Sequence, residues 1–295
     1  MKRLLSALCL CTALAINASA AESHADYVVK RVLDIVSKVK EADPKAVPMM
    51  FWDFDGTIIK GDISCGLPDE KGGFVYSGLA ELSIKAGLSR VIKPANAKRY
   101  NDVIYPELCK LGVWLGYPFI AQLHVGMEES VIQAFAKREF EKTMKHWIFS
   151  SSKEIYTRLK AAGVKMYVIS ASPELYVQAT AETLDIPISQ ITGIRLESDG
   201  GVITPRIVYP VSDGEGKTDY LRRIVAAVPH AVAVAGFGNS YHTDGPFLRH
   251  IVQGVLPGNV KPFAMMINNP NPPAGFEGLF YSVNQDETVS ANTEK

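Results

Sequence analysis

Four short apolar runs divide the chain, and polar residues follow the first three. The runs cover residues 47–52, 164–169, 231–235 and 262–267. Continuous apolar runs of this length are typical of strands buried on both faces, as in parallel sheets. Asp53 follows the first run, Ser170 the second, and a loop with Asn239 and Asp244 the third. The pattern predicts buried strands that each deliver polar side chains at one end.

Segments with helical periodicity or helix-capping residues separate these runs. Helices are expected at residues 26–40, 151–162, 172–184 and 218–228. Gly163 suits the end of the second helix, and Ser172 before Pro173 suits an N-cap at the start of the third, a role we prefer to ligand binding. Residues 193–209 alternate around Asp199-Gly200-Gly201, which predicts a hairpin. Strands alternating with helices predict an α/β fold with a doubly wound parallel sheet, where ligands bind at the carboxyl ends of the strands.

Residues 61–147 lack this strand pattern and are expected to form a helical module inserted into the sheet domain. Glycine and proline breaks and many aromatic residues mark this stretch. The expected division is a core of residues 21–60 and 148–268, a helical cap of residues 61–147 and a C-terminal tail of residues 269–295. Asn, Pro, Glu and Ser are frequent in that tail, so we expect it to be poorly ordered.

The first twenty residues indicate export. Lys2-Arg3 precede an apolar run from Leu4 to Ile16 that is too short to span a bilayer, and Ala18-Ser19-Ala20 offers small residues for cleavage. We expect residues 1–20 to be a signal peptide, which places the mature chain in the periplasm or outside the cell. An uncleaved anchor is the alternative. After cleavage, nothing in the sequence predicts membrane association.

The charge composition limits the classes of binding partner, and the cysteine content limits the possible disulfides. Lys and Arg number 31, and so do Asp and Glu, so no basic surface for nucleic acid is predicted. Cys65 and Cys109 remain after signal cleavage, and an oxidising compartment would permit a disulfide between them if their side chains meet. The sequence leaves that pairing and the oligomeric state open.

Asp53 and Asp55 are the first candidates for chemistry. Because they lie two residues apart, they leave a continuing strand on the same face. Unpaired carboxylates at the end of a buried strand are costly unless a cation or hydrogen-bond donors compensate them. Gly56 lets the backbone approach a ligand closely, and Thr57 adds a hydroxyl. A hard divalent cation with oxygen ligands, Mg²⁺ in the simplest case, would relieve the repulsion.

Together, the polar strand ends offer what phosphoryl transfer requires. The reaction needs an in-line nucleophile, an acid for the leaving oxygen and partners for the phosphate oxygens. Asp53 can attack phosphorus, and Asp55 can protonate the leaving oxygen and later deprotonate water. Thr57 and Ser170 can bind phosphate oxygens, while Lys217 neutralises charge.

Four ordered motifs resemble those of the haloacid dehalogenase (HAD) superfamily. They are Asp53-Phe54-Asp55-Gly56-Thr57, Val168-Ile169-Ser170-Ala171-Ser172, Lys217, and Gly238-Asn239-Ser240 followed by Asp244. The resemblance covers nearly the whole mature chain. It implies a HAD-like Rossmannoid core with a helical cap that selects the substrate, a nucleophilic first Asp, an acid/base second Asp, and phosphate binding by the Ser and the Lys. The chain is similar to the phosphoserine-phosphatase-like branch, and most closely to exported bacterial phosphorylcholine phosphatases.

The expected function is a Mg²⁺-dependent phosphomonoesterase that hydrolyses a small phosphorylated metabolite. The expected metal ligands are Asp53, Asp55, Asn239 and Asp244. Most members of the superfamily have Asp where this chain has Asn239, so weaker Mg²⁺ binding is expected. Whether Asn239 or Asp244 is the direct ligand stays open.

Other functions remain compatible with the same motifs. Phosphotransfer to an acceptor other than water is one, and a binding or surface protein that lost metal affinity through Asn239 is another. Dehalogenation is disfavoured because it would leave Asp55 no proton to manage and would need no metal. A choline-like headgroup would suit aromatic faces such as Trp114 or Tyr117 beside a carboxylate such as Asp62, although aromatic residues in a small module more often form its core.

Overall fold

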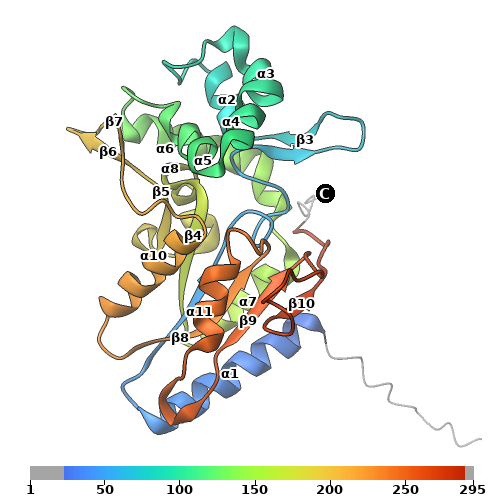
Figure 1. Ribbon diagram of the computed structural model, residues 1–295, viewed down its shortest axis with the longest axis vertical. Coiled ribbons are helices and arrows are strands. Elements are labelled where there is room, and N and C mark those ends of the chain that lie inside the picture. The colour runs from blue at the N-terminus through green and yellow to red at the C-terminus, as the bar shows by residue number, and fades with distance from the viewer. Residues whose placement is uncertain (1–22, 290–295) are drawn as a thin grey trace, which may run out of the picture.

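A six-stranded parallel sheet with strand order β10-β9-β8-β1-β4-β5 forms the centre of the structure (Figure 1). The computed structural model describes residues 23–289, so the expected signal peptide at residues 1–20 lies outside the described range. The strands are β1 (Val47–Trp52), β4 (Lys165–Pro173), β5 (Ile191–Ile194), β8 (Ala231–Gly238), β9 (Phe263–Ile267) and β10 (Tyr281–Val283). Trp52 lies opposite Val168 and Phe237, so the residues that follow these three positions emerge at one edge. The predicted doubly wound parallel sheet is confirmed.

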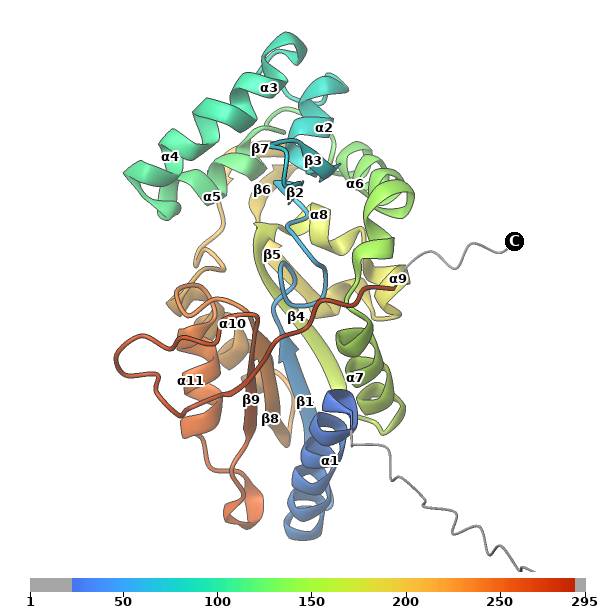
Figure 2. The same ribbon diagram turned by 90° about the vertical axis from the view of Figure 1, so that its right-hand side faces the viewer.

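Helices cover both faces of this sheet (Figure 2). They are α1 (His24–Ala42), α7 (Ser150–Ala161), α8 (Glu174–Gln178), α9 (Ala181–Leu184), α10 (Glu215–Ala226) and α11 (Gly245–Gln253). Alternate side chains of β1 point to opposite faces. Met50 and Trp52 therefore join the hydrophobic core under α1 and α7, while Met49 and Phe51 join the core under α10 and α11. Within residues 23–289 no helix is both long and apolar enough to cross a bilayer.

The segment expected to be a single helix at residues 172–184 differs from the prediction. Strand β4 stays extended as far as Pro173, and two short helices, α8 and α9, follow it. Pro173 is the N-cap of α8, and no side chain caps that helix. The expected capping role of Ser172 is therefore wrong, because its side chain is used elsewhere.

The C-terminal segment is ordered within the described range, which corrects the expectation of a poorly ordered tail. Strand β10 pairs in parallel with β9, with Tyr281 opposite Met265. Gln285, beyond the strand, is buried. Pairing of one more strand with the sheet edge satisfies backbone groups, and a polar composition alone does not reveal this. Residues 290–295 lie outside the described residues.

A mainly helical part lies beyond the carboxyl ends of the strands, at the top of Figure 1. Its main helices are α2 (Leu79–Lys85), α3 (Ala97–Arg99), α4 (Tyr105–Leu111), α5 (Val113–Gln122) and α6 (Glu129–Glu139), with short 3-10 or π turns at Pro94–Asn96, Tyr100–Ile104, Phe140–Met144 and Lys145–Trp147. It also holds a hairpin that the sequence did not predict, β2 (Gly66–Pro68) with β3 (Phe74–Ser77). The hairpin predicted at residues 193–209 is confirmed as β6 (Leu196–Asp199) with β7 (Val202–Ile207). It packs with this part, since the Gly126 amide donates to the Ile203 carbonyl at 2.8 Å.

Candidate active site

Asp53 directly follows β1 and is almost completely buried, with 4% of its surface exposed. Its backbone amide donates to the carbonyl of Phe237 at 2.9 Å, which continues the pairing of β1 with β8. The chain then turns sharply at Gly56, whose φ is +69°. Any other residue would be strained at this φ, and its Cβ, 1.9 Å from the Asn239 side-chain nitrogen, would displace Asn239.

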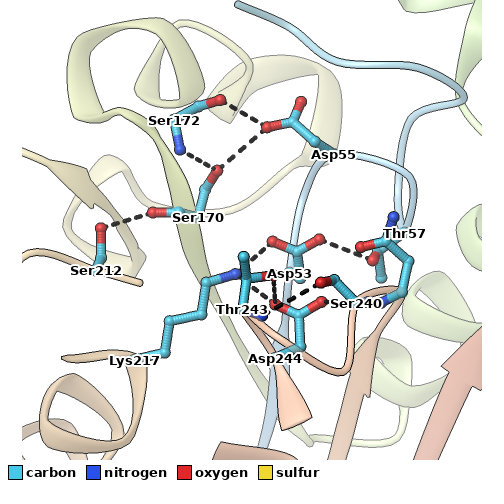
Figure 3. A network of polar contacts seen from close by, with 11 residues as sticks. Asp53, Asp55, Thr57, Ser170, Ser172, Ser212, Lys217, Ser240, Thr243 and Asp244 are labelled. Carbon is cyan, nitrogen blue, oxygen red and sulfur yellow. Dashed lines mark hydrogen bonds and ion pairs between the residues drawn. The ribbon is translucent and has the colours of Figure 1, made fainter. Parts of the chain in front are cut away.

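Lys217, from the first turn of α10, is the cation of the site (Figure 3). Its Nζ lies 2.6 Å from Asp53 Oδ1 and 2.6 Å from Asp244 Oδ1, and the lysine is fully buried. Burial opposes the charged form of Lys217, but the carboxylates of Asp244 and Asp53 outweigh it and raise the pKa of the lysine. One ammonium group is thus shared by two buried carboxylates.

The environment of Asp53 shifts its own titration upward. Burial is the largest cause and the charge of Asp244 the next, while Lys217 and the Thr57 hydroxyl act in the opposite direction. Together they raise the pKa of Asp53 to about 6. The 2.6 Å contact with the Lys217 ammonium favours the ionised form of Asp53 near neutral pH.

Asp244 is saturated by donors from the protein. Its Oδ2 accepts the amides of Asn239 and Ser240, each at 2.9 Å, and its Oδ1 accepts the Thr243 hydroxyl at 3.1 Å in addition to Lys217. Asn239 lines the cavity described below, whereas Asp244 does not. This arrangement favours Asn239 as the residue that faces a ligand and Asp244 as the residue that holds the loop and the lysine.

Asp55 is half-buried and lies across the site from Lys217 and Asp244, where it accepts hydrogen bonds from other donors (Figure 3). Its Oδ1 accepts the Ile63 amide at 2.6 Å, and its Oδ2 accepts the Ser172 hydroxyl at 2.7 Å. Burial first, and then the nearby charges of Asp62 and Asp53, raise the pKa of Asp55 well above its usual range. This environment favours the protonated form of Asp55 more than an exposed position would.

Ser172 contacts Asp55 in the site, although the sequence pattern predicts a helix N-cap at this residue. Its hydroxyl also accepts a hydrogen bond from Ser64 at 2.9 Å, so two serines approach Asp55 in a row. The spacing between Ser170 and Ser172 is the sequence feature that could have predicted this contact, because residues two apart share a face if β4 stays extended. The prolonged strand produces that arrangement, and a helix starting at Ser172 would not.

Thr57 and Ser170, expected to bind phosphate, are both fully buried and bonded within the protein. The Thr57 hydroxyl donates to Asp53 Oδ2 at 2.9 Å. The Ser170 hydroxyl accepts the Ser172 amide at 3.0 Å and lies 3.5 Å from Asp55 Oδ2. Neither residue lines the cavity. The structure thus brings all the sequence-predicted site residues together, with these two contacting the carboxylates.

A cavity of about 200 Å³ opens over the two aspartates. The sheet domain contributes Asp53, Asp55, Ala171, Ser172, Asn239, Ser240 and Thr243, and the helical part contributes Asp62, Tyr105, Tyr117 and Ile120. Of the aromatic residues considered for a headgroup, Tyr117 faces this cavity, while Trp114 is 71% exposed. Tyr105 is an additional lining residue. Cys65 and Cys109 are both free thiols.

The oxygen atoms around this cavity are suitable ligands for Mg²⁺. Between residues 23 and 289 no three His, Cys, Asp or Glu side chains are grouped so as to hold a metal ion by themselves. The cavity nevertheless presents the carboxylates of Asp53 and Asp55 and the amide of Asn239, which are oxygen ligands of the kind that hard cations prefer. Lys217 is shared between Asp53 and Asp244, so a divalent cation beside Asp53 would add compensation for the two buried carboxylates.

Substitution of Ser172 by Ala should lower kcat by about 10- to 100-fold, which corresponds to loss of a hydrogen bond to a charged group. The reason is that Asp55 loses the 2.7 Å hydrogen bond from Ser172, which stabilises its ionised form. Steady-state kinetics measures the loss, and Ser198→Ala in the exposed β6 strand is the matched control. An unchanged kcat would show that the Ser172 contact has no catalytic role.

Comparison with known proteins gives a consistent result. The model of the haloacid dehalogenase-like hydrolase family matches residues 50–249. The search of curated proteins gave no match. A solved structure of a protein of unknown function from Bordetella pertussis Tohama I is similar, with 16% identity, a TM-score of 0.61, and coverage of 81% of this chain and 99% of that one. A protein from Anaerococcus prevotii DSM 20548 is similar with 12% identity, a TM-score of 0.58, and coverage of 88% and 94%.

A HAD family hydrolase from Salmonella enterica subsp. enterica serovar Typhi is similar with 15% identity, a TM-score of 0.50, and coverage of 81% of this chain and 68% of that one. At these identities the likeness shows the shared fold. The family model spans all four motifs whose side chains meet in the site. The chain belongs to the haloacid dehalogenase-like hydrolase family.

Proposed function

We propose that the chain is an exported, Mg²⁺-dependent phosphomonoesterase that acts through an aspartyl-phosphate on Asp53. The observation that supports it best is the contrast between two aspartates in one cavity. Asp53 is held by the Lys217 ammonium and the Thr57 hydroxyl, which favour its ionised form, whereas Asp55 contacts only neutral donors and burial shifts its pKa toward the protonated form. Two carboxyl groups in such different environments can act as a nucleophile and as an acid at the same pH.

In the first half-reaction, a carboxylate oxygen of Asp53 attacks phosphorus and the bond from phosphorus to the leaving oxygen breaks. Asp55 gives its proton to that oxygen, so the alcohol departs neutral. Lys217 Nζ, 2.6 Å from Asp53 Oδ1, compensates negative charge and fixes the orientation of the carboxylate.

In the second half-reaction, the ionised Asp55 removes a proton from water, whose oxygen attacks the phosphorus of the aspartyl-phosphate. The bond between phosphorus and the Asp53 oxygen breaks, phosphate leaves, and both aspartates return to their starting protonation states. The Ser172 hydroxyl and the Ile63 amide stabilise Asp55 while it is ionised. Asp53 and Asn239, with Asp55 nearby, would hold Mg²⁺, which when bound neutralises charge on the phosphate.

Asn239→Asp should increase the affinity for Mg²⁺, since a carboxylate replaces a neutral amide in the cavity wall. We expect the apparent Kd to fall by about tenfold, the order of a single added favourable charge contact of about 1.4 kcal/mol. A Mg²⁺ titration of activity and of melting temperature measures it. No gain in affinity would contradict a ligand role for residue 239.

A small substrate fits the cavity of about 200 Å³. Asp62, Tyr105 and Tyr117 line the part contributed by the helical module, and a carboxylate beside aromatic rings suits a cationic leaving group, as in phosphorylcholine. The resemblance to exported phosphorylcholine phosphatases supports the same substrate class. A panel of phosphorylcholine, phosphoethanolamine and phosphoserine tests it, and equal kcat/KM values for all three would reject a selective headgroup pocket.

The first experiment is hydrolysis of p-nitrophenyl phosphate by the folded protein with and without Mg²⁺. Turnover that depends on Mg²⁺ supports the proposed function. Absence of turnover at millimolar Mg²⁺ supports the alternative of a binding protein that keeps the fold. Addition of an acceptor alcohol separates hydrolysis from phosphotransfer, because a transferase would form a new phosphate ester.

A further inference from the structure

Thr57, whose hydroxyl holds Asp53, is itself held by a residue from the far end of the chain. Gln285 lies two residues beyond β10 and only 8% of its surface is exposed. Its Nε2 donates to the Thr57 carbonyl at 3.3 Å and to Ser152 Oγ at 2.8 Å. The Ser152 hydroxyl donates to the same Thr57 carbonyl at 2.7 Å. The backbone of Thr57 is thus fixed jointly by α7 and by the C-terminal segment.

Gln285 cannot easily rotate away, because each of its other polar groups is also bonded. Its amide donates to Asn268 Oδ1 at 2.7 Å, its carbonyl accepts Asn268 Nδ2 at 2.8 Å, and its Oε1 accepts the Ser151 hydroxyl. Asn268 follows β9 with a φ of +54°, a conformation that Asn tolerates better than most residues. The side-chain donor of Gln285 is therefore presented to Thr57 in a fixed orientation.

The surrounding backbone ties the same segment to the site. The Ser150 amide donates to the Glu287 carbonyl at 2.9 Å, and the Val289 amide donates to the Ile148 carbonyl at 2.7 Å. The Phe149 amide in turn donates to the Ile58 carbonyl, next to Thr57, at 2.9 Å. The C-terminal segment therefore packs along the start of α7 and against the turn that carries the first motif.

We propose that Gln285 is a positioning residue for phosphoryl transfer, acting on Asp53 through Thr57. The inference rests on the proposed function. Because the Thr57 hydroxyl lies 2.9 Å from Asp53 Oδ2, a shift of the Thr57 backbone turns the attacking carboxylate away from its line of attack. Displacement of a reacting group by about 1 Å can cost about 10²-fold in rate, so a smaller shift has a measurable effect.

The primary test is Gln285→Met, which keeps the length and bulk of the side chain and removes the donor. We expect kcat for p-nitrophenyl phosphate to fall by about tenfold, the order of one lost buried hydrogen bond, with KM changed less than about twofold. Asn284 is the exposed neighbouring residue, and the matched control Asn284→Ala should keep the wild-type kcat. An unchanged kcat in Gln285→Met would overturn the inference.

A double-substitution cycle with Thr57→Val separates positioning from general stability. If Gln285 acts through the Thr57 hydroxyl, Gln285→Met should cost nothing further in kcat once that hydroxyl is absent. Losses that simply multiply would overturn the inference. Should Gln285→Met fail to fold, Gln285→Glu decides instead, because it keeps the shape of the side chain and replaces the Nε2 donor by a carboxylate oxygen. We expect a similar loss in kcat, and wild-type kcat would overturn the inference. An inactive wild type rejects the proposed function, whereas an active wild type with unchanged variants rejects only the role of Gln285.

Discussion

Asp53→Asn should reduce phosphatase activity by about 10⁴-fold or more, the size of effect seen when a covalent nucleophile is removed. The amide has nearly the same shape but cannot form the aspartyl-phosphate. The fold should survive, because Lys217 keeps its 2.6 Å contact with Asp244. We expect an unchanged or higher melting temperature, since burial raises the pKa of Asp53 and the charged form therefore opposes folding.

The control for this substitution is Asp69→Asn. Asp69 lies in the β2–β3 hairpin and accepts backbone amides of its own loop at 2.7–2.8 Å, away from the cavity. It should leave kcat/KM unchanged. Substantial activity in Asp53→Asn would mean that another group attacks phosphorus, and the assignment of the nucleophile would fail.

Lys217→Met should affect stability and activity together. Removing the ammonium leaves Asp53 and Asp244 buried without their shared partner, and breaking a buried ion pair costs about 3–5 kcal/mol of unfolding free energy. Loss of charge compensation at the reacting carboxylate should lower kcat by about 10²- to 10³-fold. Chemical denaturation and steady-state kinetics measure the two effects.

A second substitution distinguishes the two effects. Adding Asp244→Asn to Lys217→Met removes one of the stranded carboxylates, so part of the lost stability should return while activity stays low. Lys153→Met on the exposed face of α7 is the control for removal of a lysine. Recovery of activity in the double variant would contradict a direct role of the Lys217 charge in the reaction.

The sheet and its polar edge could be predicted because burial leaves a simple trace in the sequence. A strand covered on both faces is apolar throughout, as β1 and β8 are, and parallel strands bring their carboxyl ends together. This apolar pattern and the motifs together predict three of the site residues, Asp53, Asp55 and Lys217. The structure places them within one network of hydrogen bonds and ion pairs.

The missed features depend on contacts between distant parts of the chain. Ser172 reads as a helix cap because Pro173 and Glu174 follow it, yet β4 remains extended through this point. Gln285 lies in a polar segment whose only local signal is disorder, and its partners are Thr57 and Ser152. Tertiary hydrogen bonds of this kind override local propensity and leave no periodic pattern to find.

The most direct test of the central claim is a search for the phosphoryl group on Asp53. Wild-type protein mixed with p-nitrophenyl phosphate and Mg²⁺ is quenched in acid within a single turnover and cleaved after lysine and arginine. The peptide of residues 46–60 then contains both Asp53 and Asp55, and fragmentation mass spectrometry locates any added group. The proposed mechanism predicts a phosphoryl group on Asp53, increased in the Ser172→Ala variant. Active enzyme with no adduct, or with the group on Asp55, would contradict it.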